Sequence, residues 1–196
     1  MRQYTALPQR PLRSNTVFHR PSQSLPPQVG HEDPATSVMT DFRQVTAFTI
    51  DPDVSIDTAA RVMRRRSVHL LLVVDVRNHV LGVITSKDLL GEKPLQMISS
   101  RGVSREELLV RDLMTPSERI EVIAMDDVQH ATVGHVVATL KNKGRRHAMV
   151  VDEDADGHQT IRGLFAASQL ERQLGEQVVT LEIAHTFAEI SVALKP

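Results

Sequence analysis

The chain of 196 residues contains no cysteine and no tryptophan. Without cysteine it cannot form a disulfide framework, a thiolate metal site or a covalent cysteine intermediate. Aromatic residues are also scarce, at 3% of the chain, whereas 41% of all residues are hydrophobic. The sequence therefore predicts a substantial core that is built mainly from aliphatic side chains.

Long apolar runs and an excess of one charge are missing as well. No stretch approaches the roughly 20 apolar residues that a transmembrane helix needs, and the N-terminus lacks the apolar segment of a secretory signal. The 23 basic and 24 acidic residues give a net charge of −1, which argues against a broad basic surface for nucleic acid. We expect a soluble, cytoplasmic protein with no membrane partner and no nucleic-acid partner.

The common motifs of catalytic and metal sites are absent too. The nine histidines form no His-Glu-x-x-His or other compact ligand set, and neither a Gly-x-Ser-x-Gly elbow nor a Gly-x-x-x-x-Gly-Lys loop occurs. Asp152, Asp154 and Asp156 resemble the start of a calcium loop, but Gly163 stands where that loop needs a glutamate. A polar hairpin with an Asp-Gly turn is the simpler interpretation. We expect a protein that is not an enzyme and requires no metal.

Proline is concentrated at one end of the chain. Six of the ten prolines lie in residues 1–35, where apolar periodicity is missing. This composition predicts an extended, Pro-rich N-terminal arm. Two interpretations remain open, because the arm can be flexible or can wrap around a partner subunit.

The clearest pattern in the rest of the sequence is an internal repeat, whose two copies are Val73-Val74-Asp75 before Gly82-Val83-Ile84-Thr85, and Val150-Val151-Asp152 before Gly163-Leu164-Phe165-Ala166. Each copy is preceded by Met-Thr, at Met39-Thr40 and Met114-Thr115. The Met-to-Asp distance is 36 residues in the first copy and 38 in the second. A repeat of this size and order indicates a duplicated structural unit, and two such units create a cleft between them.

Each copy also has the same predicted order of elements. In the first copy, Ser55 is a candidate N-cap, and the spacing of one buried helical face follows at Ile56, Ala59, Ala60 and Met63. Strands are predicted over 70–74 and 80–85, and a short helix capped by Thr85 or Ser86 ends at Gly91. The second copy repeats the helical face at Val133, Val136, Val137 and Leu140. Its strands are predicted over 148–151 and 161–165, and its closing helix over 168–174.

These elements define the expected domain boundaries: the arm over 1–35, a first repeat over 36–92, a linker over 93–109, a second repeat over 110–175 and an extension over 176–196. In the linker, Ser104 and Glu107 form the capping box of a predicted short helix. The extension contains a predicted strand over 178–183 and a helix with an apolar face at Phe187, Ile190 and Leu194. We expect this extension to pack on the body or across a dimer.

Each unit is predicted to have the order β-α-β-β-α, with Met-Thr at its start and Val-Val-Asp after its first helix. The first unit ends with Gly-h-h-Thr-x-x-Asp, where h is a hydrophobic residue. This pattern resembles the CBS domain, which is named after cystathionine β-synthase. Two such units in tandem, over about 36–175, resemble a Bateman module. The resemblance implies an α/β (α+β) fold in which the two repeats pack through their sheets as a pseudo-two-fold pair. It also implies an adenine nucleotide ligand of the AMP, ADP or ATP type, a homodimer formed through the repeats, and an unknown effector protein that the module regulates.

The resemblance also implies a set of ligand-binding residues in the closing motif. In the family pattern the Asp receives the ribose hydroxyls and the Thr contacts phosphate, which assigns these roles to Asp88 and Thr85; Ile84, Ser86 and Lys87 belong to the same motif. A helix N-terminus favours an anion independently of the family. The alternative remains open that Thr85 or Ser86 only caps the helix and that Asp88 only interacts with its dipole.

In nucleotide-binding members, a basic pair that reaches the phosphates lies six and five residues before the Val-Val-Asp aspartate. The first repeat keeps only His69 of this pair, whereas the second offers Arg146 and His147, with Arg145 beside them. We expect these basic residues to serve a nucleotide whose ribose lies on Asp88. The alternatives are a solvated helix end for the arginines and a core or interface position for His69.

The second repeat departs from the motif at two positions, since Ala166 stands opposite Thr85 and Gln169 opposite Asp88. Ala166 has no polar side chain for phosphate, and Gln169 carries no charge. We therefore expect one competent cleft and one nucleotide per chain. The alternative function is a structural dimerisation or protein-interaction module that has lost ligand binding.

Overall fold

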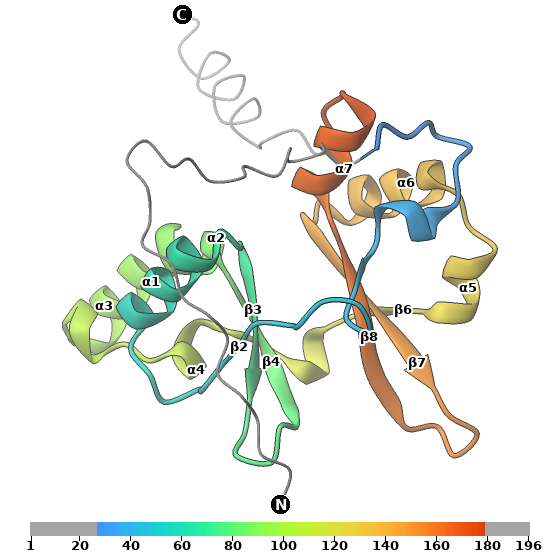
Figure 1. Cartoon of the computed structure of the whole chain (residues 1–196). Coiled ribbons are helices and arrows are strands. Elements are labelled where there is room, and N and C mark those ends of the chain that lie inside the picture. The colour runs from blue at the N-terminus through green and yellow to red at the C-terminus, as the bar shows by residue number, and fades with distance from the viewer. Residues whose placement is uncertain (1–26, 179–196) are drawn as a thin grey trace, which may run out of the picture.

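The computed structural model describes residues 27–178, which form two four-stranded sheets with helices on either side of the pair (Figure 1). Most of the predicted N-terminal arm, and the predicted strand and helix of the C-terminal extension, lie outside the described residues. No helix between residues 27 and 178 has the length and apolar character that crossing a membrane requires.

The two sheets are copies of one arrangement. The first has the order β2-β3-β4-β5, made of β2 (Thr49–Ile50), β3 (Leu70–Val74), β4 (Val80–Thr85) and β5 (Thr115–Pro116). The second has the order β1-β8-β7-β6, made of β1 (Thr40–Asp41), β8 (Gln159–Ala166), β7 (His147–Glu153) and β6 (Val122–Ala124). In each sheet an antiparallel hairpin has one short parallel neighbour and one short antiparallel neighbour. This confirms the predicted α/β fold of two tandem repeats.

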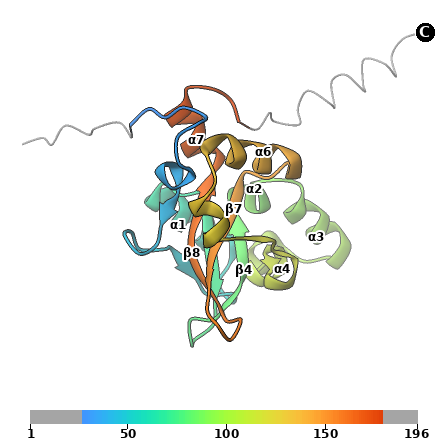
Figure 2. The same cartoon turned by 90° about the vertical axis from the view of Figure 1, so that its right-hand side faces the viewer.

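The helices follow the same division. The first sheet is accompanied by α1 (Ile56–Arg66), α2 (Ser86–Leu90), α3 (Lys93–Arg101) and α4 (Val110–Leu113), and the second by α5 (Met125–Gln129), α6 (Val133–Lys143) and α7 (Ala167–Leu174). Three short 3-10 helices complete the described residues: η1 (Ala35–Val38), η2 (Arg105–Glu107) and η3 (Ser117–Arg119). The hairpins β3-β4 and β7-β8 run side by side, and their turns point in the same direction (Figure 2).

The Met-Thr segments are exchanged between the two sheets. β1, which contains Thr40, precedes the first hairpin in the chain but pairs with β8 of the second sheet, and β5, which contains Thr115, pairs with β4 of the first. The exchange explains the glycine of each Gly-h-h motif. A Cβ built on Gly82 would collide with the Thr115 carbonyl oxygen, and a Cβ built on Gly163 would collide with the Thr40 carbonyl oxygen. In each sheet, the threonine of a Met-Thr segment therefore makes a close backbone contact with the glycine of a Gly-h-h motif.

The two long helices have the faces that their sequences predict. Ser55 caps α1 by accepting a hydrogen bond of 3.3 Å from the Thr58 amide, and α6 ends at Gly144, whose φ is 57°. The buried residues of α1 are Ile56, Ala59, Ala60 and Met63, and those of α6 are Val133, Val136, Val137 and Leu140. Both predicted faces are confirmed.

Alternation along the strands divides the interior into three layers. In β3, Leu71 and Val73 are fully buried against the helices of the first repeat, whereas Leu72 lies between them on the opposite face. Leu72 packs there with Val83 and Met149, so this small cluster joins the two sheets. A continuous apolar strand is expected when both faces are covered, as the run over 70–74 predicts.

The linker contains more structure than its sequence predicts. The predicted capping box is present, because Glu107 accepts hydrogen bonds from the amide and the hydroxyl of Ser104, and it begins η2. In addition, α3 spans Lys93–Arg101, with Pro94 in its first turn and Gly102 as its left-handed cap. Proline suits the first turn because the amide there has no partner within the helix.

Candidate functional site

The closing motif of the first repeat lies at the start of α2, where Thr85 and Asp88 bind each other. Thr85 is the N-cap, and its hydroxyl accepts a hydrogen bond of 3.3 Å from the Asp88 amide. The Asp88 Oδ2 atom accepts hydrogen bonds from the Thr85 amide at 2.9 Å and from its hydroxyl at 2.6 Å. This reciprocal cap satisfies two groups of the helix start, so the structural role considered for these residues is present.

The other carboxylate oxygen of Asp88 is also occupied. Lys93, the first residue of α3, donates from its ammonium group to Asp88 Oδ1 and, at 3.4 Å, to the carbonyl oxygen of Leu113. Asp88 as a residue is only 8% exposed. All the hydrogen-bond donors to the Asp88 carboxylate therefore come from Thr85 and Lys93, which belong to the first sheet and its helices.

The second repeat has a different pair at the equivalent position. Ala166 precedes α7 and provides no side-chain cap. The Oε1 atom of Gln169 accepts a hydrogen bond of 2.9 Å from the Thr40 hydroxyl, which belongs to the exchanged strand β1. Each closing helix thus has its polar third residue bound from within the chain, by an ammonium group in the first repeat and by a hydroxyl in the second.

His69 and Arg146 occupy equivalent backbone positions beside these helix starts. The amide of Ser86 donates to the His69 carbonyl at 3.0 Å, and the amide of Ala167 donates to the Arg146 carbonyl at 2.8 Å. The side chain of Arg146 forms an ion pair of 3.3 Å with Glu171 of α7. The equivalence that the repeat alignment predicts for these two positions is reproduced by the backbone.

His147 brings the two repeats into electrostatic contact. It begins β7, and it lies close enough to His69, Arg146 and Asp88 to interact with their charges. The pKa of His147 is lowered to about 4, mainly by burial and also by the charges of His69 and Arg146, while the Asp88 carboxylate opposes the shift. His147 is therefore a neutral imidazole at pH 7, next to the helix starts of both repeats.

A hollow opens at the boundary between the repeats, next to His69. Its volume is about 460 Å³, and its lining comes from Ser67 and His69 of the first repeat and from Ser168, Glu171 and Arg172 of α7. This volume lies within the range of small-molecule sites. Asp88 is not among the residues that line the hollow.

The other predicted site residues have varied surroundings. Ile84 is fully buried in the core of the first repeat and does not line the hollow. The hydroxyl of Ser86 lies 3.4 Å from Nδ1 of His69, Lys87 is exposed on α2, and Arg145 forms an ion pair of 3.0 Å with Glu121. The structure thus places His69, Asp88 and Arg146 within electrostatic range of His147 and leaves Ile84 in the core.

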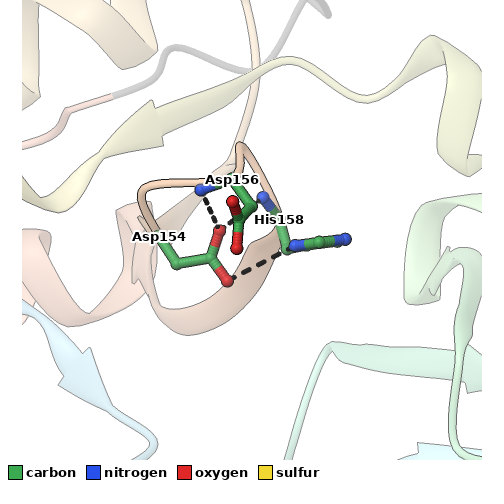
Figure 3. Close-up of side chains that lie close together, drawn as sticks. All are labelled: Asp154, Asp156 and His158. Atoms are coloured by element: carbon green, nitrogen blue, oxygen red, sulfur yellow. Dashed lines mark hydrogen bonds and ion pairs between the residues drawn. The ribbon is translucent and has the colours of Figure 1, made fainter.

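The acidic turn that resembles a calcium loop is a hairpin turn between β7 and β8. Asp154, Asp156 and His158 are exposed and lie together at its tip (Figure 3). The Asp154 carboxylate accepts hydrogen bonds from the amides of Asp156 and His158, at 3.0 and 2.9 Å, and Gly157 has a φ of 81°. The turn is held by these bonds, which confirms the polar hairpin predicted from the sequence.

The sequence did not identify two residues that bind at this site, Lys93 and Thr40. The position of Lys93, five residues after Asp88 and beyond the end of α2, was the only available signal for an ion pair. Thr40 was recognised as part of a motif, but its partner Gln169 is 129 residues away. Both contacts depend on tertiary structure that periodicity does not specify.

The geometry defines a tandem α/β repeat protein with a hollow at the boundary between its two units. Residues 35–94 match the family model of the CBS domain, and the fold recurs in solved structures of CBS domain pairs. The described residues thus have the fold of a CBS domain pair, and the first of the two units carries the match to the CBS family model.

Three solved structures illustrate the similarity. The chain is 27% identical to CBSX2 of Arabidopsis thaliana in complex with AMP, with a TM-score of 0.50, over 71% of this chain and 94% of that one. An uncharacterized conserved protein from Pyrococcus horikoshii is 19% identical, with a TM-score of 0.54, over 78% and 100% of the two chains. The CBS domain pair of protein MJ0100, in complex with 5-methylthioadenosine and S-adenosyl-L-methionine, is 16% identical with a TM-score of 0.51, over 74% and 97%.

A curated relative is an uncharacterized 17.7 kDa protein of Acidianus ambivalens. It is 25% identical over 109 residues, which make up 55% of this chain and 63% of that protein. The chain thus spans less than two thirds of the length of this relative.

Proposed function

We propose that the chain is a non-catalytic regulatory module that binds an adenine nucleotide, of the AMP, ADP or ATP type, in the cleft between its CBS repeats. The observation that carries the proposal is that His69, Asp88 and Arg146, from both repeats, lie within electrostatic range of His147, and that His69 also lines a hollow of about 460 Å³. CBSX2, which shares 27% identity with this chain, has been crystallised with AMP, and this supports the same ligand class here.

The chemistry of these residues suits a nucleotide. A carboxylate such as that of Asp88 can accept hydrogen bonds from ribose hydroxyls. Arg146 carries a permanent positive charge, and its partner Glu171 is on α7. A phosphate group would compete with the Glu171 carboxylate for this guanidinium, because arginine forms strong hydrogen bonds with both kinds of oxyanion.

A ligand that contacts both repeats regulates only if it binds two arrangements of the repeats with different affinity. Asp88 belongs to the first repeat and Arg146 to the second, so the affinity of a ligand that contacts both residues depends on the relative position of the repeats. The response then passes to an effector protein, and a homodimer formed through the repeats would double the number of sites.

A thermal-shift scan tests the proposal directly. The full chain is heated with AMP, ADP, ATP, NAD, S-adenosylmethionine or a cyclic dinucleotide, because a ligand at 100 times its dissociation constant adds about 2.7 kcal/mol of stability. We expect a shift with an adenine nucleotide that is lost in Asp88→Ala. If the parent shifts with none of these compounds, or if Asp88→Ala binds AMP and ATP as tightly as the parent, the proposed site is wrong.

The second candidate function is a dimerisation or protein-interaction module without a ligand. It is favoured by the internal partners of Asp88 and Gln169, and by Leu90 and Leu95, two exposed apolar side chains on α2 and α3. The absence of a shift with every nucleotide, together with a dimer whose mass is unchanged by nucleotide, would favour this function over the first.

A further inference from the structure

The ion pair between Lys93 and Asp88 lies on the carboxylate that the proposed function assigns to ribose. Asp88 Oδ2 is held by Thr85, so Oδ1 is the oxygen that remains for a ligand, and the Lys93 ammonium group donates to it. The carboxylate side chain is 10% exposed and that of Lys93 is 49% exposed. The lysine therefore covers the carboxylate from the solvent side.

Lys93 is placed there by the sharp connection between α2 and α3. α2 ends at Leu90, and only Gly91 and Glu92 separate it from the first residue of α3. A Cβ on Gly91 would collide with the Lys87 carbonyl oxygen, so this close turn requires glycine. The turn brings the first residue of α3 back over the start of α2.

We propose that Lys93 is an intramolecular competitor for Asp88, which a ribose-bearing ligand must displace before the cleft of the first repeat is occupied. This inference rests on the proposed function, since it concerns the same carboxylate. A ribose hydroxyl and the Lys93 ammonium group are alternative donors to Oδ1. Displacement of Lys93 also breaks its bond to the Leu113 carbonyl, so ligand binding loosens the first turn of α3.

The competition is tested by calorimetric titration of the parent and of Lys93→Met with AMP and with adenosine. Removal of a competing ion pair of this exposure lowers the dissociation constant about two- to fivefold. The factor is equal for AMP and adenosine, because the ribose is common to both. Lys143→Met is the matched control: it removes a 3.0 Å lysine ion pair, with Glu121, at a similar side-chain exposure of 54%. It leaves both affinities unchanged.

Hydrogen exchange of residues 93–101 provides a second readout that needs no ligand. Both Lys93→Met and Asp88→Asn speed exchange of the hydrogen-bonded amides of α3, whereas Lys143→Met does not. Addition of AMP to the parent has the same effect as Lys93→Met.

The outcomes separate the two proposals. If the parent binds AMP and Lys93→Met binds it with equal or weaker affinity, the competitor role is wrong and the proposed function stands. Weaker AMP binding with unchanged adenosine binding would make Lys93 a phosphate contact instead. If neither protein binds any adenine ligand, both proposals fall. Binding by Lys93→Met alone supports both.

Discussion

Equivalent residues of the two repeats carry different charge and polarity while their backbones make the same contacts. His147 and Leu70 both begin the first strand of a hairpin, and Gln169 and Asp88 both stand in the first turn of a closing helix. The partner of each closing residue differs accordingly, with Thr40 on Gln169 and Lys93 on Asp88. Ligand chemistry is therefore decided at single positions rather than by the duplicated backbone.

His147 gives the protein a predicted sensitivity to mild acid. Its folded pKa of about 4 lies below the ordinary value of 6.5, so the unfolded chain binds a proton first as the pH falls. The stabilising contribution is complete above pH 6.5 and is lost progressively between pH 6.5 and pH 4, by an amount on the order of 3 kcal/mol. Thermal unfolding from pH 8 to pH 4 measures it.

The control for this prediction is His147→Leu, because Leu70 stands at the same position of the first repeat. The variant should unfold at a temperature that changes much less between pH 6.5 and pH 4 than that of the parent. Parallel curves for the two proteins over this interval would show that His147 does not titrate as its burial implies.

The exchange of the short strands is the feature that joins the two repeats at the level of elements. β1 is fixed to β8 by a bidentate ion pair, in which Arg162 donates to Asp41 at 2.8 and 2.9 Å. Arg162 also lies 3.5 Å from Asp152, which binds Arg43 at 2.8 Å. These contacts hold the segment before α1 on the second sheet, so neither sheet is complete without residues from the other half of the chain.

Gly82→Ala and Gly163→Ala are each predicted to destabilise the protein by about 2 kcal/mol, the usual cost of forcing an extra carbon into a packed site. The new Cβ would press on the Thr115 or Thr40 carbonyl and separate the exchanged strand. Gly134→Ala is the control, because a Cβ in that position of α6 meets only ordinary contacts and alanine favours a helix. Urea unfolding of the three variants compares them; equal midpoints would refute the role of the exchange.

Replacement of Arg162 is predicted to reduce the stability of the protein at pH 7 and the dependence of that stability on pH in acid. Hydrogen bonds from the Arg162 side chain and the Arg43 amide hold the pKa of Asp41 well below its ordinary value. A depressed carboxyl pKa stabilises the fold above the ordinary value near 4 and stops doing so as the pH falls below it. Arg162→Met should therefore lower the melting temperature at pH 7 and flatten its fall below pH 4.

The matched comparison is Arg43→Met, whose side chain is 67% exposed. Exposed ion pairs contribute little, so this variant should melt close to the parent at pH 7. If Arg43→Met and Arg162→Met lowered the melting temperature equally, the bidentate pair would not be the contact that holds β1.

Elements with local signals were predicted well from the sequence. Ser55 and the spacing of Ile56 to Met63 specify α1 because caps and helical periodicity act within a few residues. Two-residue strands such as β1 and β5 carry no periodicity, and the exchange of Thr40 and Thr115 pairs residues far apart in sequence. α3 is not predicted, because the segment around Pro94 was assigned to the linker, although proline in a first turn is compatible with a helix.

The same distinction explains the candidate site. The expectation that His69, Asp88 and Arg146 serve one ligand comes from the resemblance to the CBS domain, and it stays a prediction. The lysine on Asp88 was not predictable, because it depends on the turn at Gly91, and the location of the hollow beside α7 depends on how the repeats pack. Local sequence thus specifies which residues can meet, and tertiary packing decides which of their groups stay available.

At the scale of the whole molecule, the repeats form an unequal pair, and the number of bound nucleotides measures that inequality. The first repeat supplies a carboxylate, Asp88, whereas the second supplies an amide, Gln169, and an open hollow next to Ser168. A charged acceptor binds hydroxyl donors about twice as strongly as a neutral one. We predict one adenine nucleotide per chain in calorimetric titration, lost in Asp88→Ala and changed less than about twofold in Gln169→Ala.

The alternative is that the open hollow, rather than Asp88, is the main nucleotide site. Binding would then survive Asp88→Ala and fall at least about tenfold in a variant that fills the hollow, such as Ser168→Phe. Two nucleotides per chain, with each variant removing one, would mean that both repeats are competent and that the difference between Asp88 and Gln169 does not decide ligand binding. The number of nucleotides bound per chain therefore shows whether sequence divergence has left one nucleotide site or has kept two sites with different residues.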